Sequence, residues 1–194
     1  MKTFEELKEE LLNRAKNANA CQNGYKMGLD AKNKADLLKA ITANWFWVLI
    51  DARIVDAIYL EENFTEEELS EAGIYTRKCH EVRAVSFACG SATVKACGSA
   101  TVKACGSATV KAYDSATVRA CGSATVEAYD SATVEAYGSA TVEACGSATV
   151  RAYDESYVED CTGNIRPRYD YTIVKDYHNH KIYIRKGKFE IIEV

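Results

Sequence analysis

The middle of this chain is built from one eight-residue unit, Ala-Cys-Gly-Ser-Ala-Thr-Val-Lys, repeated in tandem. Its copies begin at Ala88, Ala96, Ala104, Ala112, Ala120, Ala128, Ala136 and Ala144, and a degenerate ninth copy begins at Ala152. A short fixed period constrains the fold strongly because every copy must adopt nearly the same conformation. In the first eight copies only three octad positions vary: the second is Cys or Tyr, the third is Gly or Asp, and the eighth is Lys, Arg or Glu.

An even period keeps each octad position on a fixed face of an extended strand. The first, fifth and seventh positions (Ala, Ala, Val) share one face, and the charged eighth position lies on the other with Ser, Thr and Cys or Tyr. A charged side chain is not buried unpaired, so the Ala/Ala/Val face is predicted to be the interior. Gly or Asp at the third position predicts the corner, because both tolerate turn geometry. The expected unit is a strand of about six residues followed by a turn.

Two octads per coil would give a two-sided β-solenoid with 16-residue coils and a thin core. Three octads per coil would enclose a triangular centre that Ala and Val are too small to fill. The remaining alternative, an antiparallel meander, would expose one whole Ala/Val face. We therefore expect the two-sided solenoid, a rod of about four and a half coils and roughly 22 Å at ~4.8 Å per coil.

Two-sided winding stacks residues that lie two octads apart. The first ladder of second-position residues is Cys89, Cys105, Cys121, Tyr137 and Tyr153, and the second is Cys97, Tyr113, Tyr129, Cys145 and Cys161. Stacked aromatic pairs are expected for Tyr113 with Tyr129 and for Tyr137 with Tyr153. The spacing would permit disulfides. Without a secretory leader or a C-x-x-C motif, however, the eight Cys are expected to be free thiols, and no metal site is expected.

Tyr137-Gly138-Ser139-Ala140-Thr141 and its copies resemble the octads of bacterial ice-nucleation proteins, over residues 88–159. The resemblance implies paired octads in a 16-residue coil and a tyrosine ladder. The ice-active face of that family resembles a Thr-x-Thr array, whereas each octad here offers Ser-x-Thr. Ice binding is therefore the second functional reading. It would use Thr93, Thr109, Thr125 and Thr141.

The ends of the rod need caps, because bare solenoid ends expose strand edges and apolar core. Residues 1–79 are expected to be a helical domain or cap, with capping boxes at Thr3-x-x-Glu6 and Thr65-x-x-Glu68 and a helix over 35–43. Part of this region, 18–25 with Trp45-Phe46-Trp47, resembles a helical module of uncharacterised bacterial and phage proteins, and both tryptophans are expected in its core. Residues 80–161 are assigned to the solenoid, and 162–194 to a three-stranded antiparallel meander capping the last coil.

The eighth-position charges change sign along the rod: Lys95, Lys103, Lys111 and Arg119 are followed by Glu127, Glu135, Glu143, Arg151 and Glu159. Either duplication drift or steering of a charged partner would produce this order. The formal net charge of −4 and the lack of a polybasic run argue against nucleic acid. The longest apolar run, 45–50, is far shorter than the ~20 residues of a membrane span. With no leader sequence visible, a cytoplasmic location is expected.

Catalysis is not expected from this sequence, because no catalytic triad order, phosphate loop or paired carboxylates stand out. Cys79 and His80 are adjacent in a predicted strand and so point in opposite directions, and His178 and His180 lack a third ligand. We therefore expect no catalytic residue, cofactor or metal. The sequence predicts a binding protein for a protein partner or for itself, such as a phage or mobile-element inhibitor of a host system. The candidate contact residues are Thr93, Thr109, Thr125, Thr141, Lys95, Lys111, Tyr113, Tyr129, Tyr137 and Tyr153.

Overall fold

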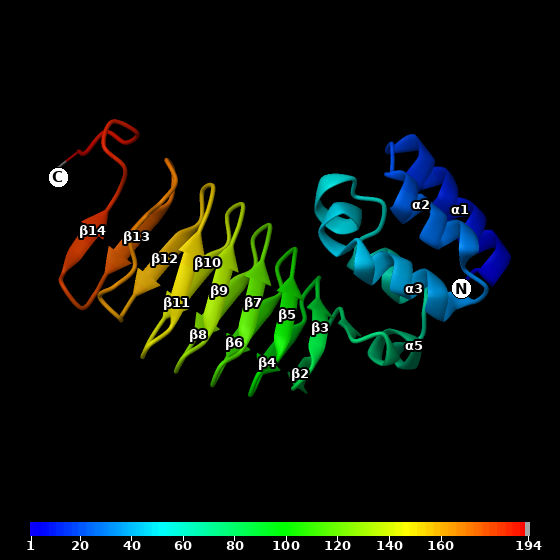
Figure 1. Ribbon diagram of the computed structural model, residues 1–194, viewed down its shortest axis with the longest axis horizontal. Helices are drawn as coiled ribbons and strands as arrows, with labels where there is room; N and C mark the ends of the chain where they lie inside the picture. The colour runs from blue at the N-terminus through cyan, green and yellow to red at the C-terminus, as the bar shows by residue number, and fades with distance from the viewer. Residues whose placement is uncertain (193–194) are drawn as a thin grey trace.

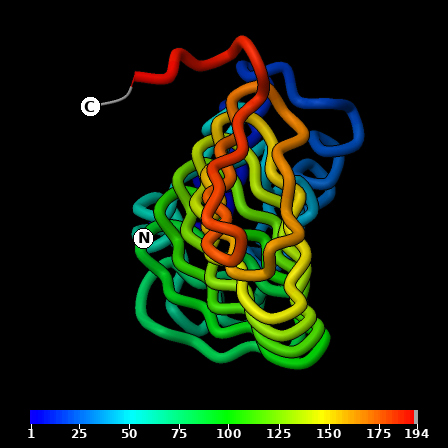
Figure 2. Tube along the Cα trace, turned by 90° about the vertical axis from the view of Figure 1, so that its left-hand side faces the viewer, coloured from blue at the N-terminus to red at the C-terminus, as the bar shows by residue number. Residues whose placement is uncertain are grey.

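The computed structural model describes residues 1–192. The octads form the expected two-sided β-solenoid, with helices at its N-terminal end and an antiparallel strand pair at the other end (Figure 1). Viewed along the rod, the coils superimpose as flattened loops (Figure 2). The fold class predicted from the repeat is confirmed.

Each octad contributes a strand of four residues, shorter than the expected six or so. β3 (Val85–Ala88) leads into the first octad, and the octad strands are β4 (Thr93–Ala96), β5 (Thr101–Ala104), β6 (Thr109–Ala112), β7 (Thr117–Ala120), β8 (Thr125–Ala128), β9 (Thr133–Ala136), β10 (Thr141–Ala144), β11 (Thr149–Ala152) and β12 (Tyr157–Asp160). The other four residues form a corner closed by a turn hydrogen bond, as where the Ala116 N–H donates to the Tyr113 carbonyl oxygen at 3.1 Å. The strand is short because the turn takes the residues on either side of Gly or Asp.

Alternate strands belong to opposite sheets. Four further strands complete the sheets: β1 (Ile74–Tyr75), β2 (Cys79–Val82), β13 (Ile173–Asp176) and β14 (Lys181–Tyr183). The short sheet has six strands in the order β1-β3-β5-β7-β9-β11, and the long sheet has eight in the order β14-β13-β12-β10-β8-β6-β4-β2. Neighbouring octad strands are parallel and pair residues one coil apart, for example Thr109 with Thr125 and Val110 with Val126. This is the register that pairing of two octads predicts.

The interior is the Ala/Ala/Val face, as expected. Val102, Val110 and Val118, at the seventh octad position, have no exposed surface, and neither do the alanines beside them; Val150, near the end of the short sheet, is partly buried. Burying these small side chains between two sheets gives a thin, continuous core along the rod.

The corner residue at the third octad position lies in the left-handed region whether it is Gly or Asp. Gly106 has φ 64° and Asp114 has φ 56°. Gly adopts this backbone without steric cost. Asp114 gains a compensating contact, because its Oδ2 accepts a hydrogen bond at 2.8 Å from the Gly98 N–H one coil earlier. The same contact joins Asp154 to the Gly138 N–H at 2.9 Å.

The solenoid is longer than the octads. Before them, β1 (Ile74–Tyr75) and β2 (Cys79–Val82) pair in parallel with β3 and β4. After them, β13 (Ile173–Asp176) continues the long sheet in parallel with β12. With six and eight strands in its two sheets, the rod has about six coils rather than about four and a half.

The C-terminal cap is a pair of antiparallel strands, β13 and β14 (Lys181–Tyr183). The expected third strand does not form over residues 189–192, and 193–194 lie outside the described residues. The first strand of the expected meander begins at Ile173 and is a further coil strand. Beside the end of the short sheet, Ile165 packs into the core and Tyr169 lies on the ring of Tyr153. Pro167, between them, has no N–H with which to extend that sheet.

The N-terminal region is a small helical unit with its own apolar core. It comprises α1 (Phe4–Asn17), α2 (Gln22–Asp30), α3 (Lys34–Ala43), the π-helical turn η1 (Trp47–Asp51), α4 (Ala57–Asn63) and α5 (Glu66–Glu71). Both predicted capping boxes are present, at the starts of α1 and α5. The sequence reading missed α2, η1 and α4. No helix within residues 1–192 combines the length and apolar character needed to cross a membrane.

The helical unit packs directly on the first coils of the solenoid. Trp45 is buried, as expected, with its ring centroid 5.0 Å from that of Phe87 in β3. Cys89 and Cys105, at the first two corners of one ladder, belong to the same buried cluster. A Cβ at Gly90 would lie 2.7 Å from the Ala57 side chain, so the corner glycine permits this close contact. The helices therefore cap the start of the rod.

Candidate functional site: the outer faces of the solenoid

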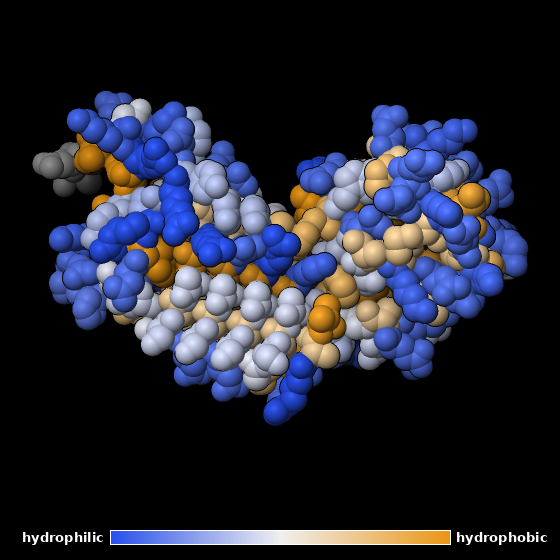
Figure 3. All heavy atoms as spheres, in the orientation of Figure 1, coloured by the Kyte–Doolittle hydropathy of each residue, from blue (hydrophilic) through white to orange (hydrophobic). Residues whose placement is uncertain are grey.

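Each outer face of the solenoid carries three straight rows of side chains. Threonines form one row, charged residues the next, and Cys or Tyr the third. Strands pair in register, so successive members of a row are ~4.8 Å apart. Figure 3 shows such rows on one face as parallel bands, near-neutral beside hydrophilic. On the long sheet the rows include Thr93, Thr109, Thr125, Thr141, then Lys95, Lys111, Glu127, Glu143, then Cys97, Tyr113, Tyr129, Cys145.

The long sheet brings together most of the predicted contact residues. The four threonines, both lysines, Tyr113 and Tyr129 all lie on β4, β6, β8 and β10 or at the corners that follow them. Tyr137 and Tyr153 instead follow β9 and β11 of the short sheet, so they occupy the opposite edge of the flat solenoid. The ten predicted residues therefore divide into a set of eight on one face and a separate pair.

The sign change of the charged row on the long sheet is joined by an ion pair. Lys111 Nζ lies 2.8 Å from Glu127 Oε2, and the Tyr129 hydroxyl donates to the same oxygen at 2.9 Å. The hydrogen bond from Lys111 lowers the pKa of Glu127. The hydrogen bond to Glu127 raises the pKa of Tyr129 to about 12. Lys111, Glu127 and Tyr129 thus form one fixed polar group in the middle of the face.

The short sheet has a different charge order, with one acidic residue between basic ones. Glu135 lies 2.7 Å from Arg119 Nε and 3.6 Å from Arg151 Nη1, and Lys103 precedes this group in the row. Glu135 is therefore already paired on both sides. The two faces present similar side chains in different electrostatic order.

The predicted tyrosine pairs are confirmed. The rings of Tyr113 and Tyr129 are 5.2 Å apart with an interplanar angle of 11°, and those of Tyr137 and Tyr153 are 4.5 Å apart at 6°. Tyr169 extends the second stack, 4.7 Å from Tyr153. The sequence reading missed Tyr169 because it lies outside the octads, yet its spacing of one coil from Tyr153 was a usable signal.

All eight cysteines are free in the structure. The interaction with the Cys105 thiol, together with burial, holds the pKa of Cys89 well above its usual range. Burial, with a smaller effect of Cys161, raises the pKa of Cys145 to about 11. These thiols are protonated near neutral pH and are weak nucleophiles.

The Cys79–His80 neighbours do not form a catalytic pair. Cys79 is exposed on β2, whereas His80 occupies an inward register position and stacks on Tyr75 with ring centroids 4.3 Å apart. The His80 Nε2 lies 2.9 Å from the Arg77 carbonyl oxygen. Within residues 1–192, no three His, Cys, Asp or Glu side chains gather as a metal site requires.

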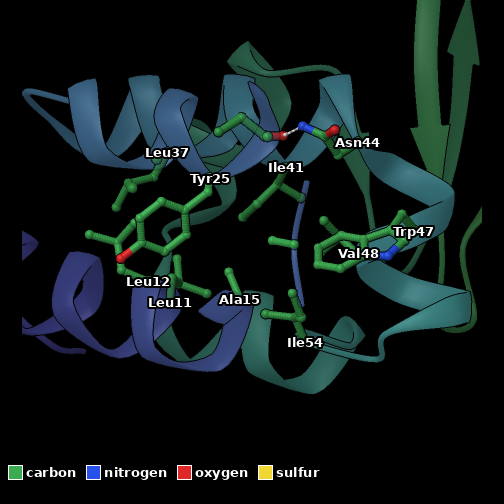
Figure 4. A pocket seen from close by; sticks show the side chains of 14 residues that line it. Leu11, Leu12, Ala15, Tyr25, Leu37, Ile41, Asn44, Trp47, Val48 and Ile54 are labelled. Atoms are coloured by element: carbon green, nitrogen blue, oxygen red, sulfur yellow. Dashed lines mark hydrogen bonds between the residues drawn. The ribbon is translucent and has the colours of Figure 1, made fainter. Parts of the chain in front are cut away.

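A cavity of about 60 Å³ lies among α1, α2, α3 and η1, lined by apolar side chains such as Leu11, Tyr25 and Trp47 (Figure 4). Asn44 is a polar residue at its wall, and its Nδ2 donates to the Ala40 carbonyl oxygen at 2.9 Å. Small-molecule sites are typically at least ~300 Å³. This cavity is therefore smaller than a typical small-molecule site.

Comparisons with protein-family models, curated proteins and solved structures gave no match to this chain. The likeness to ice-nucleation repeats therefore rests on the octad motif alone.

Proposed function

We propose that this is a non-enzymatic binding protein that presents the outer face of the long sheet to a macromolecular partner. The observation that supports the proposal is the order of that face. Seven parallel strands, from β2 to β13, form this face. Each strand contributes one side chain to the threonine row, one to the charged row and one to the Cys/Tyr row; outside the octads, other residues occupy the same positions. A face fixed by hydrogen bonds along its whole length loses little conformational entropy on binding.

The chemistry of the face favours recognition by charge and hydrogen bonding. Lys95, Thr125 and Glu143 are exposed, and no large apolar side chain interrupts the rows between β4 and β10. Charged rows steer association and set specificity, and their effect weakens as salt increases. Binding is therefore expected to be fast and sensitive to ionic strength.

The test compares the two faces of the same rod. Thr109→Lys with Thr125→Lys alters the long sheet, and Thr117→Lys with Thr133→Lys makes the matched change on the short sheet. Circular dichroism first confirms that each variant is folded. Each variant is then used as bait in an affinity experiment that captures the macromolecular partner. Loss of the captured partner with the long-sheet variant alone supports the proposal. Equal capture by both variants contradicts it.

The second candidate function is ice binding, supported by the four threonines of the long sheet in register at ~4.8 Å intervals. Thermal hysteresis and ice-recrystallisation assays test it directly. Activity that disappears with Thr109→Lys plus Thr125→Lys would establish ice binding. An inactive wild-type protein excludes it and leaves the first proposal in place.

A further inference from the structure

The charged row of the long sheet has an order that complements itself when reversed. From β2 to β13 the row reads Glu81, Lys95, Lys111, Glu127, Glu143, Glu159 and Lys175, one residue per strand. If a second row runs in the opposite direction with Glu127 at the centre, the ends pair Glu81 with Lys175. The next positions pair Lys95 with Glu159, and then Lys111 with Glu143. Six contacts join opposite charges and one joins like charges.

We infer that the long sheet binds a second copy of this chain, face to face and antiparallel, about a twofold axis that runs parallel to the strands at β8. The inference rests on the proposed function and names its partner. A symmetric dimer uses the same patch on both copies. If the twofold axis ran along the rod instead, every charged residue would face the same residue of the second chain, and all seven contacts would be repulsive.

The short sheet does not have this property. Its row is Lys103, Arg119, Glu135 and Arg151, from β5 to β11. Reversed about Arg119, it gives two contacts between opposite charges and one between like charges, and with a single acidic residue no register of this row joins more than two opposite charges. Self-complementarity is therefore specific to the long sheet and is not a general result of the repeat.

The side chains of the long-sheet row are placed to make these contacts. Lys95 and Glu143 are exposed, and among residues 1–192 neither takes part in a salt bridge within its own chain. Within the described residues 1–192, Glu159 accepts hydrogen bonds only from the hydroxyls of Tyr157 and Tyr177, each at 3.2 Å. At the axis, Glu127 is neutralised by Lys111 at 2.8 Å, which reduces the repulsion of the central pair.

The antiparallel arrangement also brings opposite charges together at the ends of the rod. The segment after β12, residues 161–192, contains the C-terminal cap and has seven Lys and Arg against three Asp and Glu, a net charge of +4. The helical region, residues 1–79, has eleven Lys and Arg against fourteen Asp and Glu, a net charge of −3. With β13 of one copy facing β2 of the other, each basic cap extends toward the acidic helical unit of its partner.

The size of the face sets the expected strength. Seven strands at ~4.8 Å, and a width of ~20 Å including side chains, give about 600 Å² per copy. Standard stable interfaces bury about 800 Å² per partner. We therefore expect a weak, reversible dimer whose affinity falls at least about tenfold between low and high salt.

A charge-swap experiment tests this interface. The first variant carries Lys95→Glu and Lys111→Glu, and the second carries Glu143→Lys and Glu159→Lys. In the proposed register each variant places like charges opposite each other and is expected to be monomeric. A one-to-one mixture restores opposite charges at all four positions and is expected to dimerise. Sedimentation velocity, in reducing buffer at low salt, measures all three samples.

The matched control carries Lys103→Glu and Arg119→Glu on the short sheet and is expected to dimerise like the wild type. Circular dichroism verifies that every variant is folded. A monomeric wild type, a control that loses the dimer equally, or a mixture that fails to dimerise would overturn the inference. If the chain is monomeric but the long-sheet face still captures another macromolecule, the self-association fails and the proposed function stands. If neither occurs, both fail.

Discussion

The corner contact of Asp114 allows a quantitative prediction. Asp114 holds a left-handed backbone with φ 56°, and its Oδ2 accepts from the Gly98 N–H at 2.8 Å. Asp114→Ala keeps the strained backbone but loses the acceptor. Asp114→Gly loses the acceptor but removes the strain. The two variants therefore separate the hydrogen bond from the backbone conformation.

The magnitudes follow from these two effects. A net hydrogen bond contributes about 0.5–1.5 kcal/mol. The left-handed conformation costs an ordinary residue roughly 1–2 kcal/mol, less for Asp, and little for Gly. We expect Asp114→Ala to reduce the free energy of unfolding by about 1–2 kcal/mol and Asp114→Gly by less than about 1 kcal/mol. The free energy of unfolding of the Asp114→Ala variant should thus be about 1 kcal/mol lower than that of the Asp114→Gly variant.

Urea unfolding followed by circular dichroism measures the difference, and similar m-values establish that the same surface is exposed in each variant. Ser115→Ala, at the next exposed corner position, is the control and should change stability by less than about 0.5 kcal/mol. If Asp114→Ala is as stable as Asp114→Gly, the left-handed corner does not govern the choice of Gly or Asp. The explanation given for this octad position would then be wrong.

Three further predictions concern the core, a tyrosine and the thiols. Val118→Ala, at a position with no exposed surface, should cost about 2–3 kcal/mol in urea unfolding. The pKa of Tyr129 is about 12 in the folded protein, against ~10 in the unfolded chain. Because the folded state binds this proton more tightly, the free energy of unfolding should fall as the pH rises from 10 to 12. Tyr129→Phe should reduce that fall, measured as the urea midpoint against pH. With a thiol reagent, buried Cys89 should react at least about a hundredfold more slowly than exposed Cys161 in the folded protein.

The repeat allowed most of the solenoid to be predicted because its chemistry is strictly local and periodic. The charged eighth position determined which face is buried, and the third position determined the corner. Pairing of octads then placed Tyr113 on Tyr129 and Tyr137 on Tyr153, as the structure has them. The strand length was overestimated because alternation alone does not show where the turn hydrogen bond begins.

The parts outside the octads depend on tertiary contacts and were harder to predict. β1 has two residues and becomes a strand by pairing with β3, which no local pattern reveals. Ile173 to Asp176 alternates like a hairpin strand and does pair antiparallel with β14, but its other neighbour is β12, with which it pairs in parallel. The contact between the helical unit and the solenoid, through Trp45 and Phe87, likewise joins residues distant in the sequence. The two ends of the self-complementary charged row, Glu81 and Lys175, became visible only once the pairing of β2 and β13 was known.

The most direct test of the long-sheet interface is a distance measurement between two copies. A spin-labelled non-canonical amino acid is placed at position 125, 93 or 117 in turn, and pulsed dipolar spectroscopy is recorded at low salt. In the proposed dimer the facing sheets are ~10 Å apart, and Thr125 lies close to Thr125 of the second chain. Thr93 is displaced from Thr93 of the second chain by a further ~19 Å along the rod. Thr117 lies on the short sheet and faces away from the interface. An antiparallel long-sheet dimer predicts the shortest distance at position 125, a longer one at 93 and the longest at 117. A shorter distance at 117 than at 125, or no distance between copies at position 125, would contradict it.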